Sequence, residues 1–164
     1  MRTSKAHERI IGIDPGVERM GVGIIDVTRG VPQCVHVTCV TTSKKLDQSV
    51  RIEQLAEQLS AIIKKYKPDR AAVEKLFFSH NVKTAMSVAE ARGVILLTLR
   101  QWKLPVTEWT PQQIKQHVTG YGNADKKQIQ TTVKLILRLP RTVKSDDAAD
   151  ALAVALTAQQ LPPR

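Results

Sequence analysis

Three strand-like segments follow one another near the start of the chain, before any helical pattern begins. Residues 9–14 and 21–26 are apolar runs on either side of a Pro15-Gly16 turn, and residues 34–40 are rich in β-branched side chains. Strands so close in sequence pair antiparallel, because a parallel pair needs a crossover of about a dozen residues or more. The start of the chain therefore predicts an antiparallel meander.

The hydrophobic period changes from residue 50 onward. Apolar side chains recur at helical spacing over residues 52–66, and residues 70–74 then form a short apolar strand. A second helical segment, apolar on most sides, covers residues 81–100 and precedes a strand at 105–109. Strands joined by helical crossovers pair in parallel. The sequence thus predicts an α/β fold in which helices flank a mixed five-stranded sheet.

Three further helices are expected in the last third of the chain. Thr110 is a good N-cap with Pro111 at the first helical position, and a glycine-rich loop at 120–123 leads to the next helix. The final helix is rich in alanine, and Ser145 or Asp146 is its expected N-cap.

The length of 164 residues indicates a single domain over residues 1–164. Residues 1–8 are interpreted as a basic N-terminal extension and residues 159–164 as a frayed tail. The apolar content of 42% is ordinary for a globular protein and excludes a disordered basic tail. The sequence has neither a signal-peptide core nor a membrane-spanning run, so a cytoplasmic protein without a membrane partner is expected.

The formal net charge of +10 and the pI of about 9.9 favour a polyanionic partner, with nucleic acid ahead of an acidic membrane surface. The two cysteines do not suggest a zinc site. Strand alternation would place Cys34 and His36 on one face and Cys39 on the other, where they could not readily bind one metal ion. Buried thiols in a reducing cytoplasm are the simpler interpretation.

Four carboxylates stand out against this basic background. Asp147 and Asp150 lie one helical turn apart among alanines, where two like charges repel unless a cation such as Mg²⁺ compensates them. Asp14 and Glu74 each end an apolar strand. Each also has a structural explanation: a turn before Pro-Gly, a solvated strand end, or a charge that complements a helix dipole. Two further carboxylates, Asp26 and Asp146, are interpreted as structural.

Five motifs occur in order over residues 9–158: Ile-Gly-Ile-Asp-Pro-Gly, Val-Glu-Lys-Leu-Phe-Phe-Ser-His-Asn, Ala-Arg-Gly-Val, Ile-Lys-Gln-His-Val-Thr-Gly-Tyr-Gly-Asn-Ala-Asp-Lys and Asp-Ala-Ala-Asp-Ala-Leu-Ala. Together they resemble the bacterial Holliday-junction resolvase family RuvC. The resemblance implies an RNase H-like fold and an endonuclease, a crossover junction endodeoxyribonuclease of bacterial recombination and DNA repair. It also implies cutting of four-way junction DNA with Mg²⁺ or Mn²⁺, leaving 5′-phosphate products.

By the same resemblance Asp14, Glu74, Asp147 and Asp150 are the catalytic metal ligands. Four carboxylates can hold two divalent ions about 3.5–4 Å apart, an arrangement that hydrolyses phosphodiesters without a serine or cysteine nucleophile. Some family members have histidine at the position of Asp147, and Asp146 is an additional carboxylate beside it. Whether Asp146 contributes to the metal site therefore stays open.

Several residues are candidates for holding DNA. The resemblance implies that Phe77 stacks on an unpaired base near the cut, and that Lys115 and Lys126, which flank the glycine-rich loop, match lysines important in the family. Phe78 and Trp109 are expected in the core. The remaining candidates follow from the residues themselves: Tyr121 in the glycine-rich loop, and a basic stripe at helical spacing formed by Lys134, Arg138 and Arg141. His80 and His117 are expected to be surface or hydrogen-bonded residues.

A two-fold homodimer is expected because the chain carries one acidic cluster, whereas resolving a junction takes two symmetric cuts. The helix over 81–100 is a candidate interface, since it is apolar on more sides than one sheet can cover. Its large apolar residues are Met86, Val88, Val94, Ile95, Leu97 and Leu99. The family resemblance further implies the branch-migration proteins RuvA and RuvB as partners.

Three alternatives remain open. A ribonuclease H-type enzyme that cuts RNA–DNA hybrids would carry a similar metal site. A non-catalytic DNA-binding module would be expected to have lost carboxylates, whereas all four positions are acidic. The first motif also resembles the phosphate hairpin of sugar kinases and actin-like ATPases, but those proteins bind nucleotide between two such domains and this chain has room for one.

Overall fold

The computed structural model describes residues 7–75 and 82–160 of the chain. Its strands are β1 (His7–Asp14), β2 (Arg19–Thr28), β3 (Val31–Thr41), β4 (Arg70–Glu74) and β5 (Val106–Trp109). Its helices are α1 (Gln48–Tyr66), α2 (Val82–Gln101), α3 (Pro111–Thr119), α4 (Lys126–Ile136) and α5 (Asp146–Gln159). Within the described ranges, no helix is long and apolar enough to cross a membrane.

The strands form one mixed sheet in the order β3-β2-β1-β4-β5. The first three strands pair antiparallel as a meander, and β4 and β5 are added in parallel beside β1 after helical crossovers. The prediction of a mixed five-stranded α/β sheet is confirmed. Because β1 and β4 are parallel, their carboxyl ends lie at the same end of the sheet.

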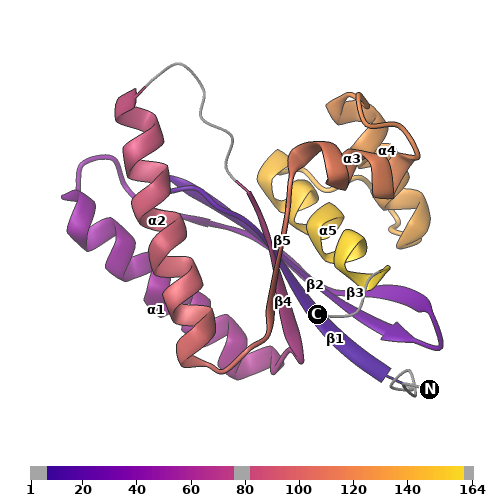
Figure 1. Ribbon diagram of the computed structural model, residues 1–164, viewed down its shortest axis with the longest axis horizontal. Coiled ribbons are helices and arrows are strands. Elements are labelled where there is room, and N and C mark those ends of the chain that lie inside the picture. Colours follow the sequence, from indigo (N-terminus) through magenta and orange to yellow (C-terminus); the bar gives the residue numbers. More distant parts are fainter. Residues whose placement is uncertain (1–6, 76–81, 161–164) are drawn as a thin grey trace.

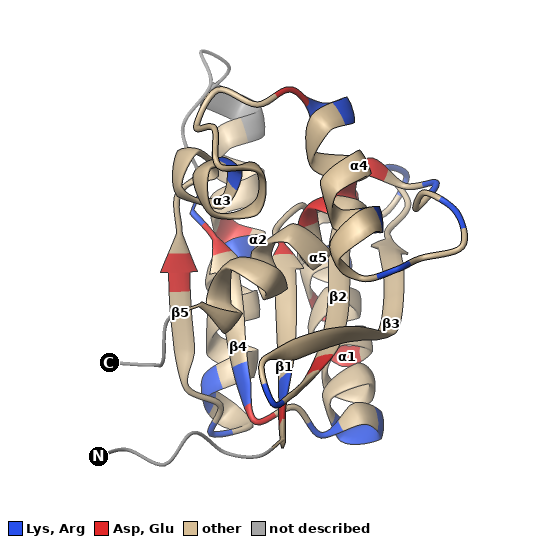
Figure 2. Cartoon of the chain, turned by 90° about the vertical axis from the view of Figure 1, so that its right-hand side faces the viewer, with Lys and Arg blue, Asp and Glu red and all other residues tan. Residues whose placement is uncertain are grey.

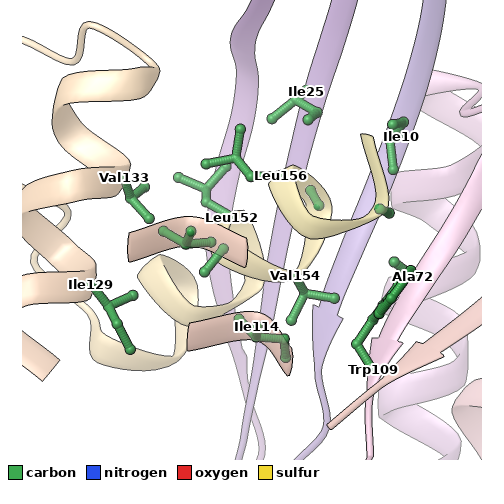
Figure 3. Packing of buried hydrophobic residues seen from close by; sticks show 14 of the residues in the cluster. Ile10, Ile25, Ala72, Trp109, Ile114, Ile129, Val133, Leu152, Val154 and Leu156 are labelled. Atoms are coloured by element: carbon green, nitrogen blue, oxygen red, sulfur yellow. The ribbon is translucent and has the colours of Figure 1, made fainter. Parts of the chain in front are cut away.

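Helices cover both faces of the sheet (Figure 1). On one face α1 and α2 bury large aliphatic side chains, among them Leu55, Leu59, Ile95 and Leu99. On the other face α5 lies against the sheet, and α3 and α4 pack outside it through Ile114, Ile129 and Val133 (Figure 3). Trp109 is buried in this second layer, as the sequence predicts.

Small residues let α5 lie unusually close to the sheet. A Cβ atom on Gly21 of β2 would lie 1.8 Å from the carbonyl oxygen of Asp147, and one on Gly12 of β1 would lie 2.2 Å from that of Ala151. Any side chain at Gly21 would therefore push the helix outward. The alanines of α5 and the glycines beneath them together hold the start of the helix against the end of the sheet at which β1 terminates.

Capping residues fix where the last three helices begin. The hydroxyl of Thr110 accepts the backbone N–H of Gln113, whose side chain accepts the N–H of Thr110 in return. Asp125 makes the equivalent reciprocal pair at the start of α4. Ser145, one of the two expected caps of the final helix, accepts the N–H of Ala148.

In the described residues, regular structure begins earlier and ends later than expected. Strand β1 begins at His7, inside the segment interpreted as a basic extension. Helix α5 continues to Gln159, whose amide donates to the carbonyl of Gly30 at 2.8 Å, and the amide of Gln160 donates to the carbonyl of His117. The frayed tail expected from residue 159 is therefore wrong for its first two residues.

A β-bulge overturns the predicted arrangement of the cysteines. The pairing of β2 with β3 skips Val35, so Cys34 lies opposite Ile25 while His36 lies opposite Ile24. Cys34 consequently packs on the α5 face, and His36 stacks on Tyr66 on the α1 face with ring centroids 4.6 Å apart. Both cysteines are free and half-buried.

Candidate active site

Two of the acidic residues meet because their strands are parallel neighbours. Asp14 is the last residue of β1 and Glu74 is the last residue of β4, and the preceding residues Ile13 and Val73 are in register. Asp14 also lies opposite Gly21 of β2 in the antiparallel pairing, and the backbone of Asp147 packs against this glycine. Figure 2 shows acidic segments gathering at this end of the sheet, beside basic segments of α3 and α4.

Burial and mutual repulsion keep these carboxyl groups from ionising freely. Burial, followed by the nearby charges of Glu74 and Asp150, raises the pKa of Asp14 to about 9. Burial likewise raises the pKa of Glu74 and of Asp150. The cluster therefore carries negative charge at a free-energy cost that a cation could offset.

The two strand-end carboxyls also influence each other's titration. A side-chain hydrogen bond between Asp14 and Glu74 raises the pKa of Asp14 and opposes the rise of the pKa of Glu74. With its raised pKa, Asp14 would have to be deprotonated before all of its oxygens could hold a metal ion.

Asp147 forms an ion pair, which the other three carboxylates do not do within the described residues. The Nε of Arg19, the first residue of β2, donates to Oδ2 of Asp147 at 2.6 Å. The same guanidinium donates through Nη2 to Oγ of Ser145 at 3.1 Å. The thiol of Cys39 lies 3.9 Å from the same Asp147 oxygen.

Asp146 is directed toward α4. Its Oδ1 accepts the side-chain amide of Gln130 at 2.7 Å, and its Oδ2 lies 3.4 Å from Nζ of Lys126. Its charge still contributes to raising the pKa of Asp150. These contacts agree with the structural interpretation of Asp146, which ties the start of α5 to α4.

The two candidate lysines border the acidic cluster. Lys115 of α3 opposes the rise of the pKa of Glu74 and of Asp150, and Lys126 at the start of α4 does the same for Asp150. Burial acts to lower the pKa of Lys126, but Asp146 and the other nearby carboxylates outweigh it, so this pKa is raised. The ammonium group of Lys126 therefore stays positive beside the cluster.

The remaining DNA-binding candidates are not gathered at the acidic cluster by any contact in the described residues. Tyr121 is 58% exposed in the loop between α3 and α4, where its backbone N–H and C=O both bond the hydroxyl of Thr119. The predicted helical stripe is wrong: α4 ends at Ile136, and Arg138 beyond it has a left-handed φ of 50°, so Lys134 and Arg138 do not share a helix face. Phe77, Phe78 and His80 lie outside the described residues.

Arg19 and Cys39 are residues of the site that the sequence patterns did not single out. The second strand was expected to begin at Gly21, which left Arg19 in a turn. Yet an antiparallel hairpin brings the residues just before residue 21 beside the end of the first strand. That signal would have placed Arg19 next to the acidic cluster.

The donor set suits hard divalent cations, since Mg²⁺ and Mn²⁺ prefer carboxylate oxygens. Raised pKa values from mutual repulsion are what such a cation would relieve. In the described part of the chain, however, no three histidine, cysteine or carboxylate side chains are already arranged to hold a metal ion. The carboxylates fit such a metal in their chemistry.

A mixed sheet with helices on both faces, with carboxylates at the adjacent ends of β1 and β4 and at the start of α5, defines an RNase H-like nuclease. The solved structure of Thermus thermophilus RuvC in complex with Holliday junction substrate matches with a TM-score of 0.86 and 30% identity, over 92% of each chain. The yeast mitochondrial Holliday junction resolvase Ydc2 shares the fold at a TM-score of 0.67 and 10% identity, over 93% of this chain and 79% of that one.

The sequence itself identifies the family. The family model for the crossover junction endodeoxyribonuclease RuvC matches residues 10–158. The RuvC of Roseiflexus sp. strain RS-1 is 51% identical over 148 residues, which cover 90% of this chain and 88% of that one. The chain belongs to the RuvC family of crossover junction endodeoxyribonucleases.

Proposed function

We propose that this protein resolves four-way DNA junctions by paired symmetric nicks during homologous recombination and DNA repair in the bacterial cytoplasm. The carrying observation is the convergence of Asp14, Glu74 and Asp150 from three distant segments, with Lys115 and Lys126 beside them. Support also comes from the 30% identical Thermus thermophilus relative, whose structure contains a Holliday junction substrate.

The cofactor we propose is a pair of Mg²⁺ ions, with Mn²⁺ as an effective substitute, held by Asp14, Glu74, Asp147 and Asp150. Such ions, when bound, activate water and neutralise charge on the phosphate during hydrolysis. The chain's own contribution is to gather carboxylates whose charge is poorly compensated, so that deprotonation and metal binding occur together. Lys115 and Lys126 are suited to bind the phosphates that flank the cut.

The DNA contacts follow from position and charge. Lys126 opens α4, where the backbone N–H groups of the first turn also favour phosphate. Tyr121, Lys134 and Arg138 are proposed as outer contacts to the DNA backbone. Phe77 is proposed to stack on an unpaired base, where such contacts contribute about 1–3 kcal/mol.

A homodimer would supply the second active site, and α2 offers a surface for it. Met86 is 61% exposed and Leu97 is 58% exposed on this helix. Gly93 lies between them on the same face, and a Cβ atom there would meet no other group within 4 Å, so a symmetry-related helix could approach closely. Ile95 and Leu99 were also expected as interface candidates, but they are fully buried in the monomer core. Contacts with RuvA and RuvB are proposed from the family alone.

The proposal is tested by cleavage of three substrates with Mg²⁺: a four-way junction, a plain duplex and an RNA–DNA hybrid. We expect paired nicks in the junction at a rate at least about tenfold above that for the other two, from differential binding of about 1.4 kcal/mol or more. Preferred cutting of the hybrid would instead favour the ribonuclease H-type alternative. Glu74→Gln is the matched control, because it keeps the fold and the basic residues while removing one metal ligand.

Junction binding separates the enzyme from a non-catalytic DNA-binding module. The Glu74→Gln protein should bind the junction as tightly as the wild type, since affinity rests mainly on lysine and arginine contacts to phosphate. Binding without any cleavage by the wild type, with either Mg²⁺ or Mn²⁺, would support the module instead.

A further inference from the structure

Arg19 is bound to the one member of the acidic cluster that lies nearest the start of α5. Its Nε donates to Oδ2 of Asp147 at 2.6 Å, and its Nη2 donates to Oγ of Ser145, the N-cap of α5, at 3.1 Å. The guanidinium therefore spans from the first residue of β2 to the first turn of α5. No other cation in the described residues makes an ion pair with Asp14, Glu74, Asp147 or Asp150.

This ion pair is in competition with any cation that the cluster binds. Asp147 still interacts electrostatically with Asp14 and with Asp150, so its charge belongs to the cluster even though its Oδ2 faces Arg19. A divalent ion drawn to the four carboxylates would be repelled by the guanidinium and would compete with it for the charge of Asp147. The divalent ion and the guanidinium of Arg19 cannot both be fully compensated by the single negative charge of Asp147.

The pair is also weak enough to be exchanged. The side chain of Arg19 is 51% exposed and that of Asp147 is 29% exposed. Ion pairs in such surroundings contribute little to stability and are screened by salt. A divalent ion held by several carboxylates gains much more from the same oxygen than an exposed guanidinium does.

We propose that Arg19 is a positioning residue that occupies Asp147 in the metal-free protein and is exchanged for a divalent cation when the cluster binds metal. This inference rests on the proposed function, because it takes Asp147 as a metal ligand. Arg19 offsets part of the repulsion among the carboxylates while metal is absent, and it sets the concentration of metal at which the site fills. The released guanidinium keeps its second anchor at Ser145.

The first test measures Mn²⁺ binding by isothermal titration calorimetry at low salt, without DNA. Arg19→Gln should bind Mn²⁺ about two- to fivefold more tightly than the wild type, the factor expected when an exposed ion pair no longer competes. The gain should shrink at high salt, where the pair is already screened. Lys44→Gln is the matched control, since it removes one positive charge from an exposed pair with Glu18 at 3.0 Å, close in sequence to Arg19.

A double-mutant comparison tests the role of Asp147 as a metal ligand separately from the exchange of Arg19. Asp147→Asn should weaken Mn²⁺ binding, and in that background Arg19→Gln should change nothing. If Asp147→Asn leaves Mn²⁺ affinity unchanged, the proposed ligand set is wrong. If Asp147→Asn weakens binding but Arg19→Gln does not tighten it, or Lys44→Gln tightens it equally, the exchange is overturned while the proposed function stands.

A second measurement needs no destabilising variant. The Nε–H resonance of Arg19, assigned by its loss in Arg19→Lys, should shift when Mg²⁺ is titrated into the wild-type protein. Its midpoint should equal that of backbone resonances around Asp150. A resonance that stays in place while the site fills would show that Arg19 keeps Asp147, and would overturn the proposal.

Discussion

At the scale of single residues, two aspartates in the same sheet respond to opposite surroundings. Asp14 is buried among carboxylates, and burial together with those charges raises its pKa to about 9. Asp26 accepts two hydrogen bonds from Arg9, at 2.6 and 2.8 Å, which lower its pKa. The chain therefore stabilises its fold at Asp26, and it gives up stability at Asp14 to keep a site that can bind cations.

Asp14→Asn should stabilise the metal-free protein in a pH-dependent manner. Folding at neutral pH requires Asp14 to take up a proton, because its folded-state pKa lies far above its unfolded value. This cost is absent below about pH 4, grows as the pH rises, and levels off near the folded-state value of about 9. We expect a gain of about 2–4 kcal/mol in the free energy of unfolding at pH 7, and almost none at pH 4.

Urea denaturation in the presence of a chelator at pH 4, 6 and 8 measures this difference. Asp26→Asn serves as the control of opposite sign, since a lowered pKa contributes stability that is present above the unfolded pKa and is lost as the pH falls. It should destabilise the protein at pH 7 and have little effect at low pH. A pH-independent effect of Asp14→Asn would contradict the raised pKa.

At the scale of elements, local signals in the sequence succeeded where local physics decides the structure. The cap at Thr110 with Pro111, and the apolar strand over 70–74, were both predicted and are confirmed, because capping and short-range hydrophobic pattern define them. The bulge at Val35 was missed because the pairing with β2 defines it. The end of α4 at Ile136 was missed because a non-glycine residue, Arg138, adopts the left-handed conformation.

The sequence likewise predicted part of the acidic site, namely its four carboxylates, but not the contacts that these carboxylates make. The resemblance and the unusual carboxylates pointed to Asp14, Glu74, Asp147 and Asp150, and strand order explains how the first two meet. The partners of Asp147 and Asp146 depend on which edge of β2 and which face of α4 lie nearby. Those contacts follow from tertiary packing, which composition and periodicity do not specify.

Gly21→Ala tests how strictly packing sets the position of α5. The added methyl group would lie 1.8 Å from the carbonyl oxygen of Asp147, so α5 must move away from β2. We expect a loss of about 1–3 kcal/mol in stability from overpacking, and a loss of cleavage of more than about tenfold, because Asp147 and Asp150 move with the helix.

Thermal unfolding and junction cleavage measure the two effects separately. Gly122→Ala is the control, since a methyl group there would make ordinary contacts of 3.4 Å or more with Gln112 and Gln116. It should change stability by less than about 0.5 kcal/mol, as do most surface substitutions. Full cleavage by Gly21→Ala would mean that the site tolerates a displaced α5.

At the scale of the whole molecule, the two helical layers have different roles. The α3–α5 layer borders the acidic cluster with basic residues, whereas the α1–α2 layer leaves Met86 and Leu97 exposed on the opposite side of the sheet. A dimer formed through α2 would leave both acidic clusters accessible to DNA. Two active sites related by a two-fold axis match the symmetry of two opposed strands in a junction.

Leu97→Glu should therefore separate dimer formation from chemistry. A charge at this exposed position disturbs the monomer little but would be buried without a partner in a two-fold interface, where the two glutamates would also repel. Light scattering should give a mass near 18.2 kDa for the variant and about twice that for the wild type at micromolar concentration.

On a supercoiled plasmid with an extruded cruciform, the variant should release mainly singly nicked circles, whereas the wild type should linearise the plasmid within one binding event. Leu135→Glu, at an exposed position on α4, is the matched control and should leave the mass unchanged. A Leu97→Glu protein that keeps the dimer mass and linearises the plasmid would place the interface elsewhere.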